Sequence, residues 1–300
     1  MDLRGATVAV TGATGFLGRY IVDALLGRGA HVVGVVRNPA RVPALAARGV
    51  ELRRADLVER DRLAAGFAGA QAVVSNAALF SLQNRAWDDH QRANVQGTAN
   101  VFDAVAGAGV TRVVHVSSVA VYAHPGADTP EDAPQLGPES RRTFTNTYAI
   151  SKAVSEQLAW EKAAAHGLAL TTLRPCAIYG AFDPNFTRVF RYLLAPPVTV
   201  MPAWLQLALV YAGDVAEAVA LALEKPVAIG RAYNVTGDPE RTVWEFAQAW
   251  RAAGGRTPLL MLPLPVPLTR TFAIARARTE LGWQNRPFVE ALRDTFAREA

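Results

Sequence analysis

The sequence predicts an α/β fold in which a doubly wound parallel sheet is joined by a smaller, discontinuous C-terminal lobe. Short apolar segments alternate with helical segments from residue 6 to about residue 174. This alternation is typical of parallel strands that are covered by helices on both faces. Beyond Pro175 the pattern changes to Pro-rich loops and further helices. The chain is therefore expected to leave the sheet, return to it and leave again.

The individual elements follow from local pattern. The apolar run at residues 6–11 predicts a strand, and the helical pattern from Phe16 to about Arg28 ends at Gly29. Nearly continuous apolar runs predict further strands at residues 31–36, 50–54, 71–76, 112–117 and 168–174. After these we expect a helix from about 214 to 224, a strand at 232–235 and helices to the end.

These elements divide the chain into two units. The unit that contains the sheet is expected to comprise residues 1–174 and about 209–236, and the smaller lobe about 175–208 and 237–300. The stretch from Tyr192 to Gly213 has 22 residues without a charge, but Pro196, Pro197 and Pro202 divide it. The pieces are too short to cross a bilayer, so no integral membrane association is expected.

Composition excludes several classes of protein. Of the 300 residues, 51% are hydrophobic and 19% are charged, which excludes a disordered tail. The net charge of +5 is scattered rather than gathered into blocks, so we expect no nucleic-acid partner. Cys176 is the single cysteine and cannot form an internal disulfide. The first residues lack the pattern of a signal peptide, which predicts a cytoplasmic protein.

A glycine-rich turn lies between the first strand and the first helix. Gly12, Gly15 and Gly18 have the spacing GxxGxxG within the segment TGATGFLG. Such glycines let the backbone turn tightly and approach a pyrophosphate, which the N–H groups of the helix N-terminus then bind. The plainer interpretation is a glycine-rich turn of an α/β protein without a ligand.

Residues at the ends of the next strands extend this site. Arg37 ends the second strand, where a carboxylate would bind the ribose of NAD(H); an arginine there fits the 2′-phosphate of NADP(H). Arg37 could instead be a solvated charge at a strand end. Asp56 and Asn76 to Ala78 follow the third and fourth strands, at the sheet edge where such folds bind ligands. Each of these residues, like Asn94, could also be a turn residue.

Tyr148 and Lys152 form a second constellation. They are spaced i, i+4 in a helical pattern that ends at Gly167, so their side chains share one face. A phenol has a pKa of about 10, and a neighbouring ammonium is expected to lower it toward the working range. Ser118, after the fifth strand, could hold a substrate oxygen. The chain has only three lysines, so a chance match is improbable.

These residues resemble the extended short-chain dehydrogenase/reductases, also called the NAD-dependent epimerase/dehydratase family. The matching segments are TGATGFLG at 11–18, DL at 56–57, NVQGT at 94–98, VSSVAVY at 116–122, YAISK at 148–152, LRPCAIYG at 173–180, AGDVAEA at 212–218 and LGW at 281–283. The resemblance implies a Rossmann-type fold and catalysis by Ser118, Tyr148 and Lys152. The cofactor-binding residues are then expected to be Gly12, Thr14, Gly15, Phe16, Leu17, Gly18, Arg37, Asp56, Leu57, Asn76, Ala77, Ala78, Asn94 and Pro175.

Departures from the family's patterns favour one branch. Val119 and Ala120 stand where sugar-nucleotide dehydratases have an acidic pair. Ala177 and Leu207 stand where sugar-nucleotide epimerases have an asparagine and an arginine that face the substrate's diphosphate, although Arg188 or Arg191 could substitute. The motifs resemble most the dihydroflavonol-reductase and 3β-hydroxysteroid-dehydrogenase branch.

The sequence thus predicts an NADP(H)-dependent oxidoreductase that interconverts a carbonyl and an alcohol. Apolar residues in the smaller lobe suit a largely apolar small molecule, although most are expected to pack its core; they are Phe182, Phe186, Tyr192, Leu193, Leu194, Met201, Trp204, Leu205 and 259–268. The alternatives are a sugar epimerase and a non-catalytic NADP-binding sensor. The five histidines have no metal-ligand spacing, and Cys176 is expected to be a small core residue. A homodimer through helices near 84–107 and 147–166 is an expectation from the family.

Overall fold

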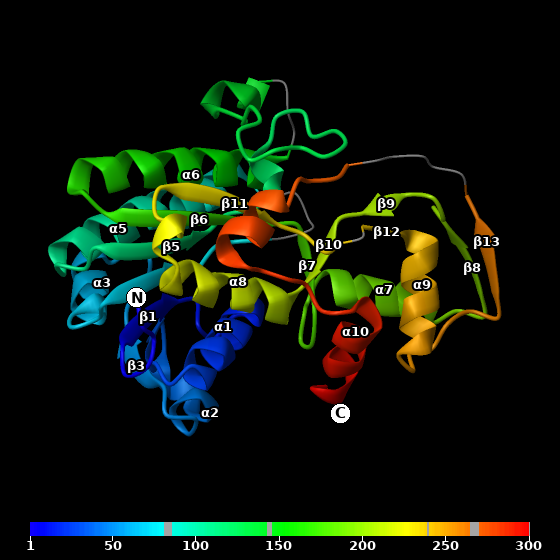
Figure 1. Cartoon of the computed structure of the whole chain (residues 1–300), viewed down its shortest axis with the longest axis horizontal. Helices are drawn as coiled ribbons and strands as arrows, with labels where there is room; N and C mark the ends of the chain where they lie inside the picture. Colours follow the sequence, from blue (N-terminus) through cyan, green and yellow to red (C-terminus); the bar gives the residue numbers. More distant parts are fainter. Residues whose placement is uncertain (81–85, 143–145, 239, 265–269, 300) are drawn as a thin grey trace.

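A computed structural model of the chain describes residues 1–80, 86–142, 146–238, 240–264 and 270–299. Its centre is a seven-stranded parallel sheet with the strand order β3-β2-β1-β4-β5-β6-β11 (Figure 1). The strands are β1 (Thr7–Thr11), β2 (His31–Val36), β3 (Glu51–Arg54), β4 (Ala72–Ser75), β5 (Arg112–Val116), β6 (Ala169–Pro175) and β11 (Arg231–Val235). The strand order reverses between β1 and β4, where doubly wound sheets have their ligand crevice. The fold class, and the positions of these strands along the chain, agree with the sequence prediction.

Helices cover both faces of the sheet. α1 (Phe16–Gly27) and α8 (Ala212–Glu224) pack together on one face, and α3 (Arg60–Phe67), α5 (Gly97–Gly107) and α6 (Thr147–His166) pack side by side on the other (Figure 1). Because successive strand residues point to opposite faces, the side chains of β1 are divided between two cores. Val8 and Val10 belong to the core under α1 and α8, and Ala9 belongs to the core under α5.

Local sequence signals fix the ends of the helix that carries Tyr148. The side chain of Asn146 caps α6 by accepting a hydrogen bond from the N–H of Ala149 at 3.1 Å. Gly167 ends the helix with φ +64°, a left-handed conformation that glycine adopts without strain. The predicted end of this helix is confirmed.

A set of small elements lies beyond the carboxyl ends of the sheet strands (Figure 1). β7 (Ala177–Tyr179) pairs with β10 (Leu209–Tyr211), β8 (Val198–Met201) pairs with β13 (Leu260–Pro263), and β9 (Gln206–Leu207) pairs with β12 (Arg241–Thr242). The accompanying helices are α7 (Phe186–Leu194), α9 (Val243–Ala252) and α10 (Phe288–Ala297). These strands were not predicted from the sequence, because two to four residues are too few for a recognisable period.

The uncharged stretch 192–213 is divided among α7, β8, β9, β10 and the start of α8. No helix in the described part of the chain is both long and apolar enough to span a bilayer.

Short helical turns connect the larger elements. α4 (Trp87–His90) continues through a π-helical segment (Gln91–Gln96) into α5, so Asn94 lies at a local widening of the helix. The other short elements are α2 (Pro43–Ala46) and the turns Pro39–Arg41, Val119–Val121, Pro138–Arg142, Pro226–Ala228 and Ala277–Leu281.

Candidate functional site

The turn between β1 and α1 depends on its glycines. Gly12 has φ +69°, and a Cβ atom on it would lie 3.0 Å from the Cα of Ala77. A Cβ atom on Gly18 would lie 2.0 Å from the backbone oxygen of Gly12. The glycine spacing therefore serves close backbone packing among the strand, the turn and the helix.

The N-terminus of α1 is suited to an anion. Gly15 is the N-cap, no side chain caps the helix, and its first turn contains no acidic residue. Thr14 and Phe16 are partly exposed beside Gly15, whereas Leu17 is buried in the core. The N–H groups of a first helical turn have no partner within the helix and attract negative charge. The backbone of this turn therefore fits the pyrophosphate of a dinucleotide.

The carboxyl ends of β1 and β4 are joined by side-chain hydrogen bonds. The Oγ1 of Thr11 accepts from the N–H groups of Asn76 (3.0 Å) and Ala77 (3.1 Å). The Nδ2 of Asn76 donates to the backbone oxygens of Thr11 and Gly12, each at 3.4 Å. The loop Asn76–Ala78 is thereby held beside the glycine turn, with Ala78 exposed.

The side chains that follow β2 and β3 differ in whether they have a hydrogen-bond partner in the protein. Arg37 is exposed, and its guanidinium has no hydrogen bond or ion pair with the residues that the structure describes. Asp56 begins a turn in which its Oδ1 accepts from the N–H of Val58 at 3.3 Å. The backbone oxygen of Leu57 accepts from the Nδ2 of Asn100 at 2.8 Å. Arg37 is thus available to a ligand, while the Asp56 carboxylate already has a local partner.

Asn94 is enclosed by protein. Its side chain is buried and accepts from the N–H of Leu79 (2.7 Å), while its Nδ2 donates to the oxygen of Leu79 (3.1 Å) and to the Oγ of Ser151 (2.9 Å). These contacts hold the loop that follows β4 against α6. The sequence pattern gave no sign of this, because Leu79 and Ser151 are distant in the chain.

Ser118, Tyr148 and Lys152 come together at the carboxyl end of β5. The hydroxyl of Ser118 is close enough to Tyr148 to lower its pKa, and the Oγ of Ser118 accepts a hydrogen bond from the N–H of Ala120 at 3.1 Å. Lys152 is buried, and its Nζ donates to the backbone oxygen of Val116 at 2.9 Å. The helical spacing of Tyr148 and Lys152 therefore directs both toward the sheet, as the sequence predicts.

The protonation of this group is governed by burial. Burial raises the pKa of Tyr148 to about 12, against the hydrogen bond from Ser118, which lowers it. Burial also lowers the pKa of Lys152 to about 8, although the nearby charge of Glu156 opposes this change. The net lowering of the Tyr148 pKa that the sequence predicts is not found, because loss of hydration on burial is the larger effect. Tyr148 is accordingly a neutral phenol that can donate a proton.

Aromatic rings surround the phenol. The ring centroids of Phe80 and Tyr148 are 4.8 Å apart in an edge-to-face arrangement, and the His90 ring is 6.0 Å from that of Tyr148. Phe80 also stacks with Phe186 of α7 at 6.2 Å. Phe80 and His90 were not predicted as site residues from the sequence. The signal for Phe80 was its position just after Ala78, at the same ligand-binding edge of the sheet.

The apolar residues of the C-terminal region have mixed roles. Leu194 and Met201 join the main core, and Phe186 and Leu205 pack against it. The side chains of Phe182, Tyr192, Leu193, Trp204, Leu259, Leu260, Leu262 and Leu264 are exposed. Residues 265–268 and the side chain of Leu207 lie outside what the structure describes. Most of these residues therefore do not pack a core.

Pro175, a predicted cofactor-binding residue, and Cys176 are adjacent at the end of β6. Pro175 ends β6 and is buried, and Cys176 beside it is a buried core residue, as predicted. Burial raises the pKa of the Cys176 thiol well above its usual value, which disfavours the nucleophilic thiolate. A separate cavity of about 490 Å³ is lined by residues that include Tyr179, Asp214 and Trp283. None of its lining residues belongs to the predicted site.

Residues 8–236 match the sequence profile of the NAD dependent epimerase/dehydratase family. The chain belongs to this family. Cinnamoyl-CoA reductase 2 of Arabidopsis thaliana is 33% identical over 252 residues, which cover 77% of this chain and 73% of that protein. A 3-beta-hydroxysteroid dehydrogenase of Mycolicibacterium neoaurum is 28% identical over 300 residues, covering 96% of this chain and 78% of that protein.

The fold of this NAD-dependent epimerase/dehydratase family member is similar to the solved structure of UDP-N-acetylglucosamine 4-epimerase from Bacillus cereus. The TM-score is 0.81 and the identity 21%, with 98% of this chain and 99% of that chain covered. The predicted family is confirmed, and the protein is an enzyme of the extended short-chain dehydrogenase/reductase type that uses a nicotinamide dinucleotide.

Proposed function

We propose that this enzyme is an NADP(H)-dependent oxidoreductase that interconverts a carbonyl and an alcohol on a small, largely apolar substrate. The observation that carries the proposal is the meeting of three side chains at the carboxyl end of β5: Ser118 lies within reach of Tyr148, and the buried Lys152 donates to the Val116 oxygen. A neutral phenol next to a second hydroxyl can hold a carbonyl oxygen and give it a proton.

The chain has the parts needed to hold the cofactor. The uncapped N-terminus of α1 would bind the pyrophosphate, and the loop Asn76–Ala78 would form the neighbouring wall. The exposed guanidinium of Arg37 supports NADP(H) rather than NAD(H), because a 2′-phosphate needs a cation at the end of β2. Asp56, Leu57 and Pro175 are proposed to line the same crevice.

Each proposed catalytic residue has a distinct task. Ser118 and Tyr148 would orient the substrate oxygen, and Tyr148 would donate its proton as that oxygen gains negative charge. The ammonium of Lys152 would stabilise the phenolate that remains. The bound cofactor supplies the hydride. Asn94, which contacts Leu79 and Ser151, is proposed to position this group rather than to touch the cofactor.

The surroundings support an apolar substrate. Phe80 and Phe186 connect the Tyr148 ring to α7 by aromatic contacts. A ligand that reaches Tyr148 would therefore meet hydrocarbon surface, which favours a substrate without charge near its carbonyl. We propose that residues of about 175–208 and 237–300 bind the substrate and that the sheet unit, 1–174 with about 209–236, binds the cofactor. The similarity to cinnamoyl-CoA reductase and to a hydroxysteroid dehydrogenase supports this substrate class.

A sugar epimerase is the second candidate, because the fold similarity to UDP-N-acetylglucosamine 4-epimerase extends over 98% of the chain. Against it stand Ala177 and Leu207, at the positions of the expected diphosphate contacts. A buried diphosphate that lacks these charge-assisted hydrogen bonds would lose several kcal/mol of binding free energy, at about 1.5–3 kcal/mol for each bond.

The test is an assay of the purified protein with NADPH and a panel of aldehydes and ketones, and separately with nucleotide sugars. We expect net loss of NADPH absorbance with apolar carbonyl compounds. The Tyr148→Phe variant should lose at least about 100-fold in kcat while it retains NADPH affinity, because the ring and its packing remain but the proton does not. Isomerised sugar without net NADPH loss would support the epimerase, and undiminished turnover in Tyr148→Phe would refute the role of the phenol.

A further inference from the structure

A buried ion pair lies one helical turn beyond Lys152. Glu156 is on α6 with no exposed side-chain surface, and Arg174 at the end of β6 is 3% exposed. The Nε of Arg174 donates to both carboxylate oxygens of Glu156, at 3.0 and 3.2 Å, and its Nη2 donates to Oε1. Such fork-shaped contacts fix both position and charge.

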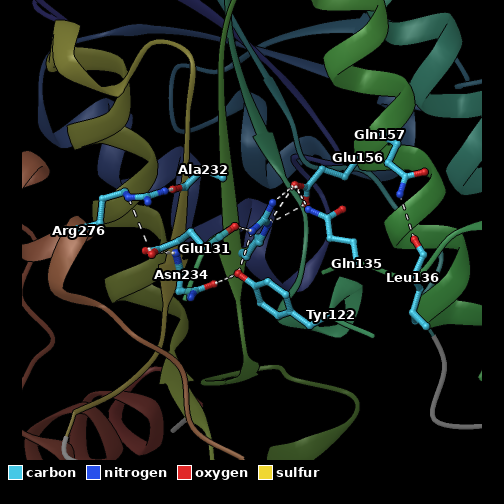
Figure 2. Close-up of polar contacts among 10 residues, drawn as sticks. Tyr122, Glu131, Gln135, Leu136, Glu156, Gln157, Ala232, Asn234 and Arg276 are labelled. Carbon is cyan, nitrogen blue, oxygen red and sulfur yellow. Dashed lines mark hydrogen bonds and ion pairs between the residues drawn. The ribbon is translucent and has the colours of Figure 1, made fainter. Parts of the chain in front are cut away.

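Further hydrogen bonds hold this pair in place. The Nη1 of Arg174 donates to the hydroxyl of Tyr122 (2.8 Å) and to the backbone oxygen of Glu131 (2.6 Å). The hydroxyl of Tyr122 in turn donates to Asn234 at 2.6 Å. Figure 2 shows Tyr122, Glu131, Gln135 and Glu156 converging on one point from different parts of the chain.

Lys152 faces few groups that could support its charge. Tyr148, Lys152 and Glu156 are spaced four residues apart, so they share one face of α6. From β5, Lys152 faces the Val116 carbonyl, and His115 is close enough for the ammonium to affect it. Burial and the charge of Lys152 hold the pKa of His115 well below its usual value, so this ring is neutral. Glu156 lies one helical turn from Lys152 on the same face of α6, and its negative charge favours the ammonium form of Lys152.

We propose that Glu156, fixed by Arg174, is a positioning residue that keeps Lys152 in its ammonium form. Its importance for turnover rests on the function proposed above. The charge balance supports the assignment, since Arg174, Glu156 and Lys152 together carry one net positive charge. When Tyr148 becomes a phenolate during reduction, the four groups are neutral in sum. A buried ion pair is often no more stabilising than apolar residues of similar size, so its presence behind Lys152 suggests a role other than stability.

Electrostatics gives the direction of the effect. Burial lowers the pKa of Lys152 to about 8 even with Glu156 present. Loss of the Glu156 charge removes the interaction that opposes burial, so the pKa must fall further. Lys152 would then become a neutral amine at a lower pH and could no longer stabilise a phenolate there.

The chain is well suited to a direct measurement, because it contains only Lys152, Lys162 and Lys225. In protein labelled with ¹³C at lysine Cε, three signals are expected, and Lys162→Arg and Lys225→Arg assign two of them. We expect the Lys152 signal of Glu156→Gln to titrate with a midpoint lower than that of the wild type by about one pH unit or more. The control is Gln157→Ala, which removes the bond from the Nε2 of Gln157 to the backbone oxygen of Leu136 (3.0 Å) without changing a charge.

The outcomes separate an electrostatic role from a structural one. Glu156→Asp keeps the charge and should keep the midpoint within about half a unit of the wild type. An unchanged midpoint in folded Glu156→Gln would overturn the proposal, as would an equal shift in Gln157→Ala. If Glu156→Gln does not fold, Glu156→Gln/Arg174→Gln removes both buried charges and leaves neither unpaired. Its midpoint should fall by less than that expected for Glu156→Gln, because the loss of the Arg174 cation offsets part of the loss of the Glu156 charge. A midpoint at or above that of the wild type would refute the assignment.

The NMR titration needs neither cofactor nor substrate, so it remains valid if the proposed reaction is wrong. Where carbonyl reduction is measurable, Glu156→Gln should move the alkaline limb of kcat to lower pH by the same amount. A shifted NMR midpoint without reductase activity would contradict the proposed function alone. A fall in kcat that is equal at every pH, with no shift of the limb, would indicate a structural role and contradict the proposal.

Discussion

Replacing Gly18 and Gly27 by alanine makes the same chemical change at two positions of helix α1. At Gly18 the new Cβ would lie 2.0 Å from the oxygen of Gly12 and 2.9 Å from the Cα of Ala13. Both are backbone atoms, so relief requires the helix to move away from the turn by about 1 Å, in an interior that is closely packed. At Gly27 no heavy atom lies within 4 Å of the added carbon, apart from the neighbouring residues and the backbone of α1 itself.

The two variants should change the free energy of unfolding in opposite directions. Overpacking costs about 1–3 kcal/mol, and alanine is better than glycine in a helix by about 1 kcal/mol. We therefore expect Gly18→Ala to lose about 2 kcal/mol of unfolding free energy and Gly27→Ala to gain up to about 1 kcal/mol. Urea unfolding measures both, and NADPH titration should show weaker binding in Gly18→Ala alone. A Gly18→Ala protein with wild-type stability and affinity would refute the account of this turn.

Three further predictions concern the cofactor, the substrate and pH. Arg37→Asp should reduce the preference for NADPH over NADH, measured as kcat/KM, at least tenfold. The control Arg231→Asp makes an equal charge change on an exposed residue of β11 and should leave this preference unchanged. An unchanged ratio in Arg37→Asp would mean that another residue binds the phosphate. Phe80→Ala should raise KM for apolar carbonyl compounds about tenfold with little change in kcat, and an unaltered KM would remove Phe80 from the substrate site. The rate of reduction should be highest below about pH 8 and should fall as the pH rises. Lys152 loses its proton near pH 8, whereas Tyr148, with a pKa of about 12, keeps its own. A rate that stays level to pH 10 would contradict this prediction.

The sequence predicted the parts of the fold that depend on local pattern. β2 at His31–Val36 was predicted residue for residue, because a buried parallel strand is a continuous apolar run. The start of α1 at Phe16 and the end of α6 at Gly167 also follow from signals within one turn of the helix. Motifs that local spacing defines also predicted the family, and they predicted that Tyr148 and Lys152 share one face of a helix.

Contacts between distant segments could not be predicted in the same way. The buried Asn94 holds Leu79 and Ser151, and Arg174 holds Glu156, through pairings that no local period encodes. The Tyr148 pKa was expected to fall because the sequence shows the lysine beside the phenol. It does not show the burial that raises this pKa, which only the packing of Phe80 and its neighbours reveals.

The central claim is that the phenol of Tyr148 and the amine of Lys152 act on a nicotinamide bound in the crevice between β1 and β4. A crystal structure of the protein with NADPH tests this most directly. We expect the pyrophosphate at the N-terminus of α1, the 2′-phosphate beside Arg37 and the reactive face of the nicotinamide toward the Tyr148 hydroxyl. A nicotinamide that points away from Tyr148, or NADPH bound outside this crevice, would contradict the claim.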